Sequence, residues 1–142
     1  ILDLDFGGAN ELTSLIITGA AEDLVNKGGL AELVLGWELV KYGSSRIRHD
    51  LFYWENVGEG TTSEVDYIVA HQMKVLPIEC KAGTSGKMKS LRLFMRNKHI
   101  SHAIRCSLEN FSQLVFQDEK ESGESKYIRI CPLYAVSSIA NL

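Results

Sequence analysis

The stretch SEVDYIVAHQMKVLPIECKAG, residues 63–83, decides the fold because it sets charged side chains into two short apolar runs. The runs EVDYIVA and KVLPIECKA have the length and the residue types of strands, and the link HQM is short enough to join them in a hairpin. The preceding segment RIRHDLFYWEN is rich in aromatic residues and ends at the turn-like VGEGTTS. Together these segments predict a meander of three strands joined by short loops.

A helix is predicted before the meander, in AEDLVNKGGLAELVLGWELVKYGSS. Its apolar residues recur at helical spacing, at Leu30, Leu33, Val34, Trp37 and Val40. Leu35 and Leu39 lie on the other side, so the second half of the helix is apolar nearly all round and is expected to be largely buried. Gly28 and Gly29 are expected to interrupt the helix near its start.

After the meander, KMKSLRLFMRNK predicts an amphipathic helix with Met88, Leu91 and Met95 on its apolar side. The segments ISHAIRCS and KYIRICPLYAV predict two more strands, separated by the polar loop QDEKESGES. The order helix, three-strand meander, helix, strand predicts an α/β fold with a mixed central β-sheet flanked by helices.

The length of 142 residues, with 45% hydrophobic and 23% charged residues, fits one globular domain with its own core. We expect this domain at residues 21–142, while residues 1–20, with the alternating ILDLDF, would be a strand or linker left from a preceding unit. No apolar run approaches the roughly 18 residues of a membrane span, so the sequence predicts a soluble, cytoplasmic protein. Three scattered cysteines indicate reduced thiols rather than a disulfide framework or a zinc site.

Four ionisable residues lie in the two central strands. Because successive side chains of a strand point to opposite faces, Glu64 shares a face with Asp66, and Glu79 shares one with Lys81. The other face would take the apolar residues of the two strands, namely Val65, Tyr67, Val69, Ile78 and Cys80. If the strands pair, all four charged side chains converge at one end of the sheet.

Such a cluster needs a cation, because burying an isolated carboxylate is costly and crowding several of them raises at least one pKa. Lys81 is one candidate, and a divalent metal is another, since Mg²⁺ prefers one or two carboxylates plus waters and leaves room for a phosphate. These parts suit phosphodiester hydrolysis, in which lysine orients water or meets the phosphate. Glu-x-Lys alone is a weak signal. Glu124 and Lys126 form the same tripeptide in the loop ESGESKY, to which we assign no chemistry.

A more specific set consists of the apolar run before Glu79, the acid Asp66 on the neighbouring strand and Glu32 on the buried helix. This set resembles the PD-(D/E)XK nuclease superfamily, in which Asp66, Glu79 and Lys81 match the signature. Glu32 matches the acid that the first helix of that superfamily often contributes. The resemblance implies a restriction-endonuclease-like fold and a DNA endonuclease or exonuclease that uses Mg²⁺ or Mn²⁺. It further implies that Asp66, Glu79 and the carbonyl of Cys80 bind the metal, while Lys81 positions the attacking water.

A narrower resemblance covers roughly residues 22–98 and continues weakly to CPLYAV. The stretches NKGGLAELVLGWELVKYG, FYWENVGEGTTSEVDYIV and PIECKAG look like the uncharacterised C-terminal domain that follows an AAA-type ATPase module in many bacterial and archaeal proteins. Ser63 stands where arginine often precedes Glu-Val-Asp, and Cys80 replaces the commoner valine. The resemblance implies an N-terminal ATPase module in the same polypeptide as a partner.

A local positive field lies in an otherwise acidic chain, whose formal net charge is -3. Residues 82–107 contain no Asp or Glu, and the basic residues around the second helix are Lys87, Lys89, Arg92 and Arg96. The simpler interpretation is that these basic residues form the solvent-exposed face of an amphipathic helix. Because such faces usually mix signs, we expect these residues to contact DNA phosphates.

The competing interpretation is a module of the same fold without catalysis, which binds DNA or docks on its ATPase. Asp66, Glu79 and Lys81 would then form a structural ion-pair cluster. Glu32 would pair with Lys81 or with a helix-end donor. The two interpretations differ in whether the cluster binds a cation, not in the fold.

Overall fold

The computed structural model describes residues 27–42, 50–58, 61–81, 88–117 and 123–141, so the expected N-terminal strand or linker at residues 1–20 lies outside the described residues. The elements are α2 (Lys27–Tyr42), β1 (Phe52–Gly58), β2 (Thr61–His71), β3 (Lys74–Cys80), α3 (Lys89–Asn97), β4 (His102–Ser107), β5 (Ser112–Gln117), β6 (Ser125–Pro132) and the 3₁₀ helix η1 (Leu133–Asn141).

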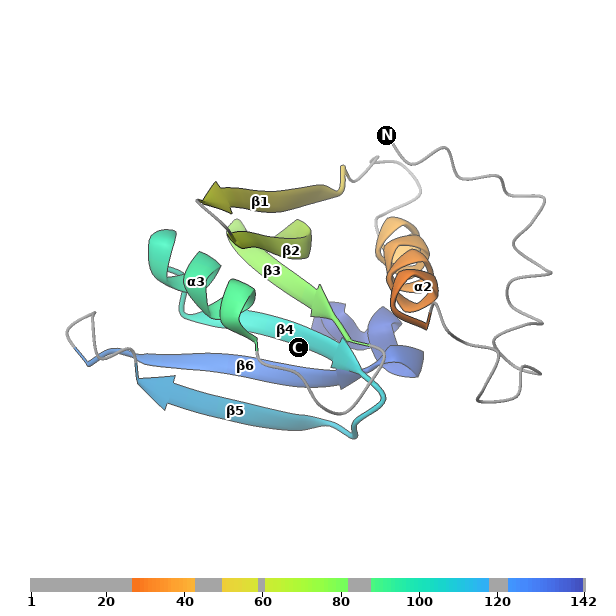
Figure 1. Cartoon of the computed structure of the whole chain (residues 1–142). Helices are drawn as coiled ribbons and strands as arrows, with labels where there is room; N and C mark the ends of the chain where they lie inside the picture. The colour runs from red at the N-terminus through yellow and green to blue at the C-terminus, as the bar shows by residue number, and fades with distance from the viewer. Residues whose placement is uncertain (1–26, 43–49, 59–60, 82–87, 118–122, 142) are drawn as a thin grey trace.

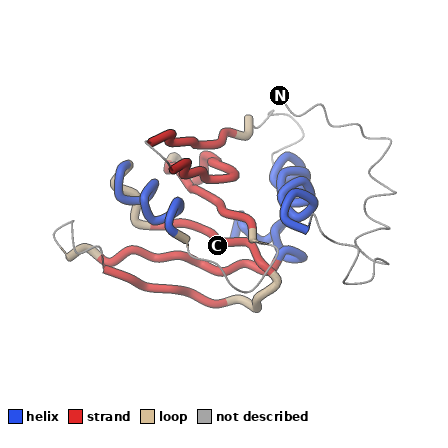
Figure 2. Tube along the Cα trace, viewed as in Figure 1, coloured by secondary structure: helices blue, strands red, loops and turns tan. Residues whose placement is uncertain are grey.

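The strands form one six-stranded sheet in the order β1-β2-β3-β4-β6-β5. β4 is parallel to β3 and to β6, and the other neighbours are antiparallel. The protein is therefore α/β with a mixed sheet, and a helix, a meander, a helix and a strand follow one another as expected (Figure 1; Figure 2). None of the described helices is both long and apolar enough to cross a membrane.

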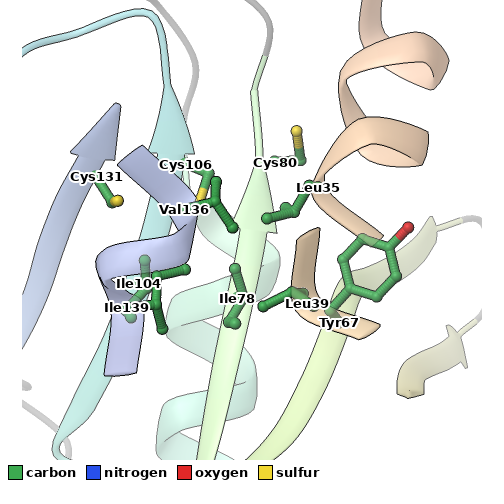
Figure 3. Close-up of a cluster of buried hydrophobic side chains, with 10 residues drawn as sticks. All are labelled: Leu35, Leu39, Tyr67, Ile78, Cys80, Ile104, Cys106, Cys131, Val136 and Ile139. Carbon is green, nitrogen blue, oxygen red and sulfur yellow. The ribbon is translucent and has the colours of Figure 1, made fainter. Parts of the chain in front are cut away.

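The sheet separates two hydrophobic cores, with α2 and η1 covering one face and α3 the other (Figure 1). The core under α2 consists of Leu35, Leu39, Tyr67, Ile78, Cys80, Ile104, Cys106, Cys131, Val136 and Ile139 (Figure 3). Its cysteines are free thiols, as expected. The core under α3 consists of Val65, Met88, Leu91, Phe94, Met95, Ala103, Ile128 and Ile130. The apolar side predicted for α3 is therefore confirmed.

The hairpin of β2 and β3 is confirmed, with a tighter turn than the three-residue link suggests. His71 pairs with Lys74, so the turn consists of Gln72 and Met73. Both turn residues have positive φ, 47° and 62°, which a two-residue turn needs in order to follow the right-handed twist of its strands. Neither is glycine, so the flanking strand pairs must offset the cost of this conformation.

One expectation about the meander is wrong, because β2 contains a β-bulge. The register between β1 and β2 shifts between Phe52 and Trp54, so that two residues of β2 face one residue of β1. Val65 therefore packs under α3 instead of sharing the α2 face with Tyr67. Asp66 lies inside this bulge, where the simple alternation of side chains does not hold.

Helix α2 differs from its prediction at its start and in its buried face. Gly28 and Gly29 are helical and do not interrupt it. Leu35 and Leu39 are buried, but the apolar residues on the other side are at most half-buried and Val40 is 47% exposed, so the second half is not buried on nearly all sides as expected. A helix that is apolar on nearly all sides does not indicate which side meets the sheet.

Gly36 lets α2 approach β2 closely. A Cβ at this position would lie 2.6 Å from the hydroxyl oxygen of Tyr67. We expect Gly36→Ala to lower the free energy of unfolding by about 1–3 kcal/mol, because the ring must move out of a packed contact. Its hydroxyl would also lose the 2.8 Å hydrogen bond that it donates to the carbonyl of Glu32.

Gly29→Ala is the matched control for this prediction. Nothing lies within 4 Å of a Cβ at Gly29, and alanine is favoured over glycine inside a helix by about 0.8–1 kcal/mol. Urea denaturation should therefore show that Gly29→Ala stabilises the protein while Gly36→Ala destabilises it. Equal stabilisation by the two changes would contradict the close approach.

The C-terminal third contains two further differences. SQLVFQ forms the edge strand β5, which the sequence analysis does not predict, because nearly all of its residues are exposed and no alternation of burial marks it. The segment predicted as one strand from Lys126 to Val136 divides at Pro132, where β6 ends and η1 begins. Proline lacks the N–H that would continue the strand ladder.

Lys126 is not in a loop, as its sequence context suggests, but in β6. It is 2% exposed, and its Nζ donates a hydrogen bond to the carbonyl of Met95 at 3.1 Å. Met95 is in the last turn of α3, where carbonyl groups lack helical partners and a cation is favoured. The second Glu-x-Lys tripeptide therefore has a structural lysine.

Candidate functional site

β2 and β3 part near the carboxyl end of β3, and Asp66 lies where they separate. The ladder between the two strands ends at the pair of Tyr67 and Ile78. Beyond that pair, the backbone N–H of Cys80 donates a hydrogen bond to Oδ2 of Asp66 at 2.6 Å. The carboxylate takes the place of a ladder carbonyl, and this bond fixes it beside β3.

Glu79 and Lys81 meet at the same end of β3, as their spacing predicts. Nζ of Lys81 lies 2.9 Å from Oε1 of Glu79. The second oxygen, Oε2, is buried and has no hydrogen-bond partner among the described residues, and Glu79 is only 4% exposed. The side chain of Lys81 is 38% exposed and reaches solvent. A buried carboxylate oxygen without a partner is costly, so this atom is where a cation or a donor would bind.

Burial raises the pKa of both carboxyl groups. At Asp66 the hydrogen bond from Cys80 and the charge of Lys81 oppose this effect without cancelling it. At Glu79 the hydrogen bond to Lys81 lowers the pKa, while the charge of Asp66 raises it further. Burial acts to lower the pKa of Lys81, but the hydrogen bond and the nearby carboxylates raise it overall. Lys81 is therefore a cation at neutral pH, and the acids favour a further cation.

Glu32 lies half-buried on α2, on the side of the cluster. Burial raises the pKa of its carboxyl group, the charge of Asp66 raises it further, and that of Lys81 lowers it. The hydroxyl of Tyr67, whose pKa burial raises to about 12, donates to the backbone carbonyl of Glu32 and holds this turn against β2. Glu32 is thus electrostatically coupled to the carboxylates on β2 and β3.

Asp66 and Glu79 are the best placed carboxylates for a divalent cation, and two carboxylates plus waters suit Mg²⁺. Among the residues that the structure describes, no group of three or more His, Cys, Asp or Glu is close enough to hold a metal ion. Glu64 is exposed and pairs across the sheet with Glu55. A metal contact through the carbonyl of Cys80 stays a prediction. Burial raises the pKa of its thiol to about 12, so the sulfur is not a thiolate ligand.

The four basic residues expected to contact DNA differ in how exposed their side chains are. Lys87 lies outside the described residues, Lys89 and Arg92 are exposed on α3, and Arg96 is half-buried. The guanidinium of Arg92 lies 4.4 Å from the ring centroid of Phe116 in β5, a cation–π contact that packs α3 against the sheet edge. Lys89 is accordingly the residue of this set most available to a phosphate.

The sequence analysis overlooked a cation beside the cluster. Arg105 of β4 is the neighbour of Glu79 in the parallel register of β3 and β4, so both side chains leave the same face of the sheet. Arg105 is 4% exposed, its Nε and Nη2 have no hydrogen-bond partner, and Nη2 lies 3.7 Å from Glu109. An arginine inside the apolar run HAIRCS was the available signal, but the sequence does not show that β4 lies next to β3.

An α/β protein with buried carboxylates and a lysine at the end of its strand meander is the class that this structure defines. Within that class the chain belongs to the family described as Domain of unknown function (DUF4143), whose family model matches residues 27–135. The match includes every residue of the carboxylate and lysine cluster. No curated protein and no solved structure matches the chain.

Proposed function

We propose that this chain is a metal-dependent nuclease-like domain with a restriction-endonuclease-like fold, which hydrolyses phosphodiester bonds of DNA. The observation that carries the proposal is the buried Oε2 of Glu79, which has no hydrogen-bond partner among the described residues and is electrostatically coupled to a second, half-buried acid, Asp66. A divalent cation held by the two carboxylates would satisfy this oxygen and lower both pKa values. The order of helix, meander, helix and strand supports the fold assignment.

The residues around this position have the charges that hydrolysis requires. Bound Mg²⁺ or Mn²⁺ would stabilise the negative charge that develops on the phosphate. Lys81, which is cationic and reaches solvent, would orient the attacking water or contact the phosphate. Arg105, whose Nη2 lies 3.7 Å from Glu109, would add a buried positive charge on the same face of the sheet, with N–H groups of the kind that bind phosphate oxygens. Glu32 would support the site from α2.

Two partners belong to the same proposal. DNA would contact the exposed basic face of α3 through Lys89 and Arg92. An AAA-type ATPase module would precede this domain in the polypeptide. The family match supports the narrower resemblance on which that second partner rests.

Calorimetric titration with Mn²⁺ tests the site without a known substrate. We expect the 142-residue chain to bind Mn²⁺ and the Glu79→Gln variant to show no detectable binding, because the variant loses a charged ligand. Glu124→Gln is the matched control, since Glu124 begins the second Glu-x-Lys tripeptide and is exposed. No binding by the wild-type chain, or undiminished affinity in Glu79→Gln, would refute the metal site.

A second candidate is the same fold without catalysis, as a module for DNA binding or protein docking. It is favoured by the absence of any third ligand near the two carboxylates in the described part of the chain. It is also favoured by the edge strand β1, where Phe52, Tyr53 and Val57 are exposed. DNA affinity that is sensitive to salt, insensitive to chelators and not accompanied by cleavage would support this candidate.

A further inference from the structure

A pocket of about 840 Å³ lies at the end of the sheet opposite to the carboxylate and lysine cluster. Lys74 at the start of β3 lines it, whereas Glu79 is at the end of the same strand. The two residues are five positions apart, which corresponds to roughly 16 Å in a strand. The pocket is therefore a separate feature from the proposed metal site.

The pocket forms because β3 and β4 run together only at their carboxyl ends. Their pairing begins at Ile78 and Ile104, while the first half of β3 pairs with β2 alone. The β2–β3 hairpin and the start of β4 thus leave a wedge-shaped space between them, which residues at the end of α3 also line. Trp54, Phe94 and Ile100 belong to its apolar wall.

Every charged residue on the wall of this pocket is basic. The basic and histidine side chains are His71, Lys74, Lys98, His99, His102 and Arg129. No Asp or Glu of the described residues lines the pocket, although the chain contains 18 acidic and 15 basic residues. Lys74, Lys98 and Arg129 form no ion pair with any described residue. The wall therefore presents positive charge without internal compensation.

His102, the first residue of β4, is held in place by two contacts. Its ring stacks on Tyr127 with 5.2 Å between centroids, and its Nδ1 lies 3.0 Å from the hydroxyl oxygen of Ser101. Arg129 is half-buried in the neighbouring strand β6. Two of the polar groups of this pocket are thus held by the sheet rather than by a loop, as a preformed ligand site requires.

We propose that this pocket binds a nucleotide, either free or at the end of a nucleic acid strand. The cations, chiefly Lys98 and Arg129, would contact the phosphate, because lysine and arginine form strong charge-assisted hydrogen bonds with it. The base would lie against the apolar wall that includes Trp54, since bases stack favourably on aromatic side chains. The volume is within the range of small-ligand pockets, about 300–1,000 Å³. The inference does not depend on the proposed metal site.

Tryptophan fluorescence offers a local readout. The chain has two tryptophans, and Trp37 on α2 does not line the pocket, so Trp37→Phe leaves Trp54 as the sole reporter. We expect adenosine 5′-monophosphate to change this fluorescence saturably. Adenosine and inorganic phosphate are each expected to bind at least about tenfold more weakly than the nucleotide. Adenosine lacks the phosphate group, and inorganic phosphate lacks the base.

Substitutions in the same background identify the residues involved. We expect Lys98→Gln and Arg129→Gln each to weaken nucleotide binding about tenfold. Lys41→Gln, which removes an exposed lysine of α2 outside the pocket, is the matched control and should leave the affinity unchanged. Glu79→Gln should also leave it unchanged, which separates this site from the metal site. Because Lys98 is exposed, its replacement does not threaten the fold.

The outcomes that overturn the inference are specific. One is the lack of a saturable change with adenosine 5′-monophosphate at millimolar concentration. Another is equal affinity of the Lys98→Gln, Arg129→Gln and Lys41→Gln variants. Inorganic phosphate binding as tightly as the nucleotide would show an anion site only. A 5′-phosphorylated oligonucleotide that binds as tightly as the free nucleotide would support the inference and identify a strand end as the source.

Discussion

Lys81→Met is expected to reduce DNA hydrolysis by about 10²–10³-fold, the typical cost of removing one group that stabilises developing charge. Lys81 is the hydrogen-bond partner of Glu79, whose carboxylate is only 4% exposed, so Lys81→Met should also lower the free energy of unfolding by about 1–3 kcal/mol. Hydrolysis is therefore compared under conditions in which the variant is folded. Mn²⁺ binding should also persist, since lysine is not a ligand of the proposed metal.

Lys126→Met is the matched comparison, because Lys126 occupies the same position in the second Glu-x-Lys tripeptide. Its Nζ donates to the carbonyl of Met95 inside the protein. Methionine keeps much of the volume but removes this charge-assisted hydrogen bond, while the carbonyl keeps the N–H of Ile100 at 2.8 Å, so we expect the free energy of unfolding to fall by about 1–2 kcal/mol. Hydrolysis by the folded variant should be unchanged.

Two measurements separate the lysines. Cleavage of duplex, branched and single-stranded DNA in the presence of Mn²⁺ reports on Lys81, and urea denaturation reports on Lys126. Cleavage at the wild-type rate by Lys81→Met would remove this lysine from the proposed chemistry. A Lys126→Met variant as stable as the wild type would refute the structural role of the buried lysine.

Glu79→Gln is expected to make the protein more stable at neutral pH, by about 0.5–2 kcal/mol, although it abolishes metal binding. Burial raises the pKa of Glu79 and of Asp66 above their ordinary values. The folded protein therefore binds more protons than the unfolded chain at pH values between the ordinary and the raised pKa. In that window the free energy of unfolding decreases as the pH rises. Because glutamine does not ionise, Glu79→Gln removes the share of this pH-dependent loss of stability that comes from Glu79.

The pH dependence provides the measurement for this prediction. Urea denaturation at about pH 5 and about pH 8 should show a smaller loss of stability in Glu79→Gln than in the wild type. Glu124→Gln replaces an exposed carboxylate and should behave like the wild type. Added Mn²⁺ should restore stability at the higher pH in the wild type and in Glu124→Gln but not in Glu79→Gln, because a bound cation favours the charged carboxylates. An unchanged pH dependence in Glu79→Gln would show that its burial does not cost stability.

The meander and α3 were predictable because their signals are local. Alternation in β2 and β3 and the helical spacing of Met88, Leu91 and Met95 depend on residues a few positions apart. The pairing of Glu79 with Lys81 has the same origin, since residues two apart in a strand share a face. The edge strand β5 was not predictable, because almost all its side chains are exposed and its residues do not alternate between apolar and polar.

Part of the site depends on neighbours that are distant in the chain. Arg105 lies beside Glu79 because β4 pairs in parallel with β3. The face of α2 that meets the sheet depends on the space that Gly36 leaves for Tyr67. The place of Asp66 depends on a β-bulge, whose extra residue shows only in the register with β1.

By itself, the sequence determined the strands of the meander, the amphipathic helix after it and the set of acids with a lysine that share one end of β3. The tertiary structure alone decided which oxygen is left unpaired, which arginine joins the cluster, and that Lys126 is buried at the end of a helix. The physical reason is the range of the interactions. Backbone periodicity acts within a few residues, whereas burial and hydrogen-bond satisfaction depend on the partners that packing brings together.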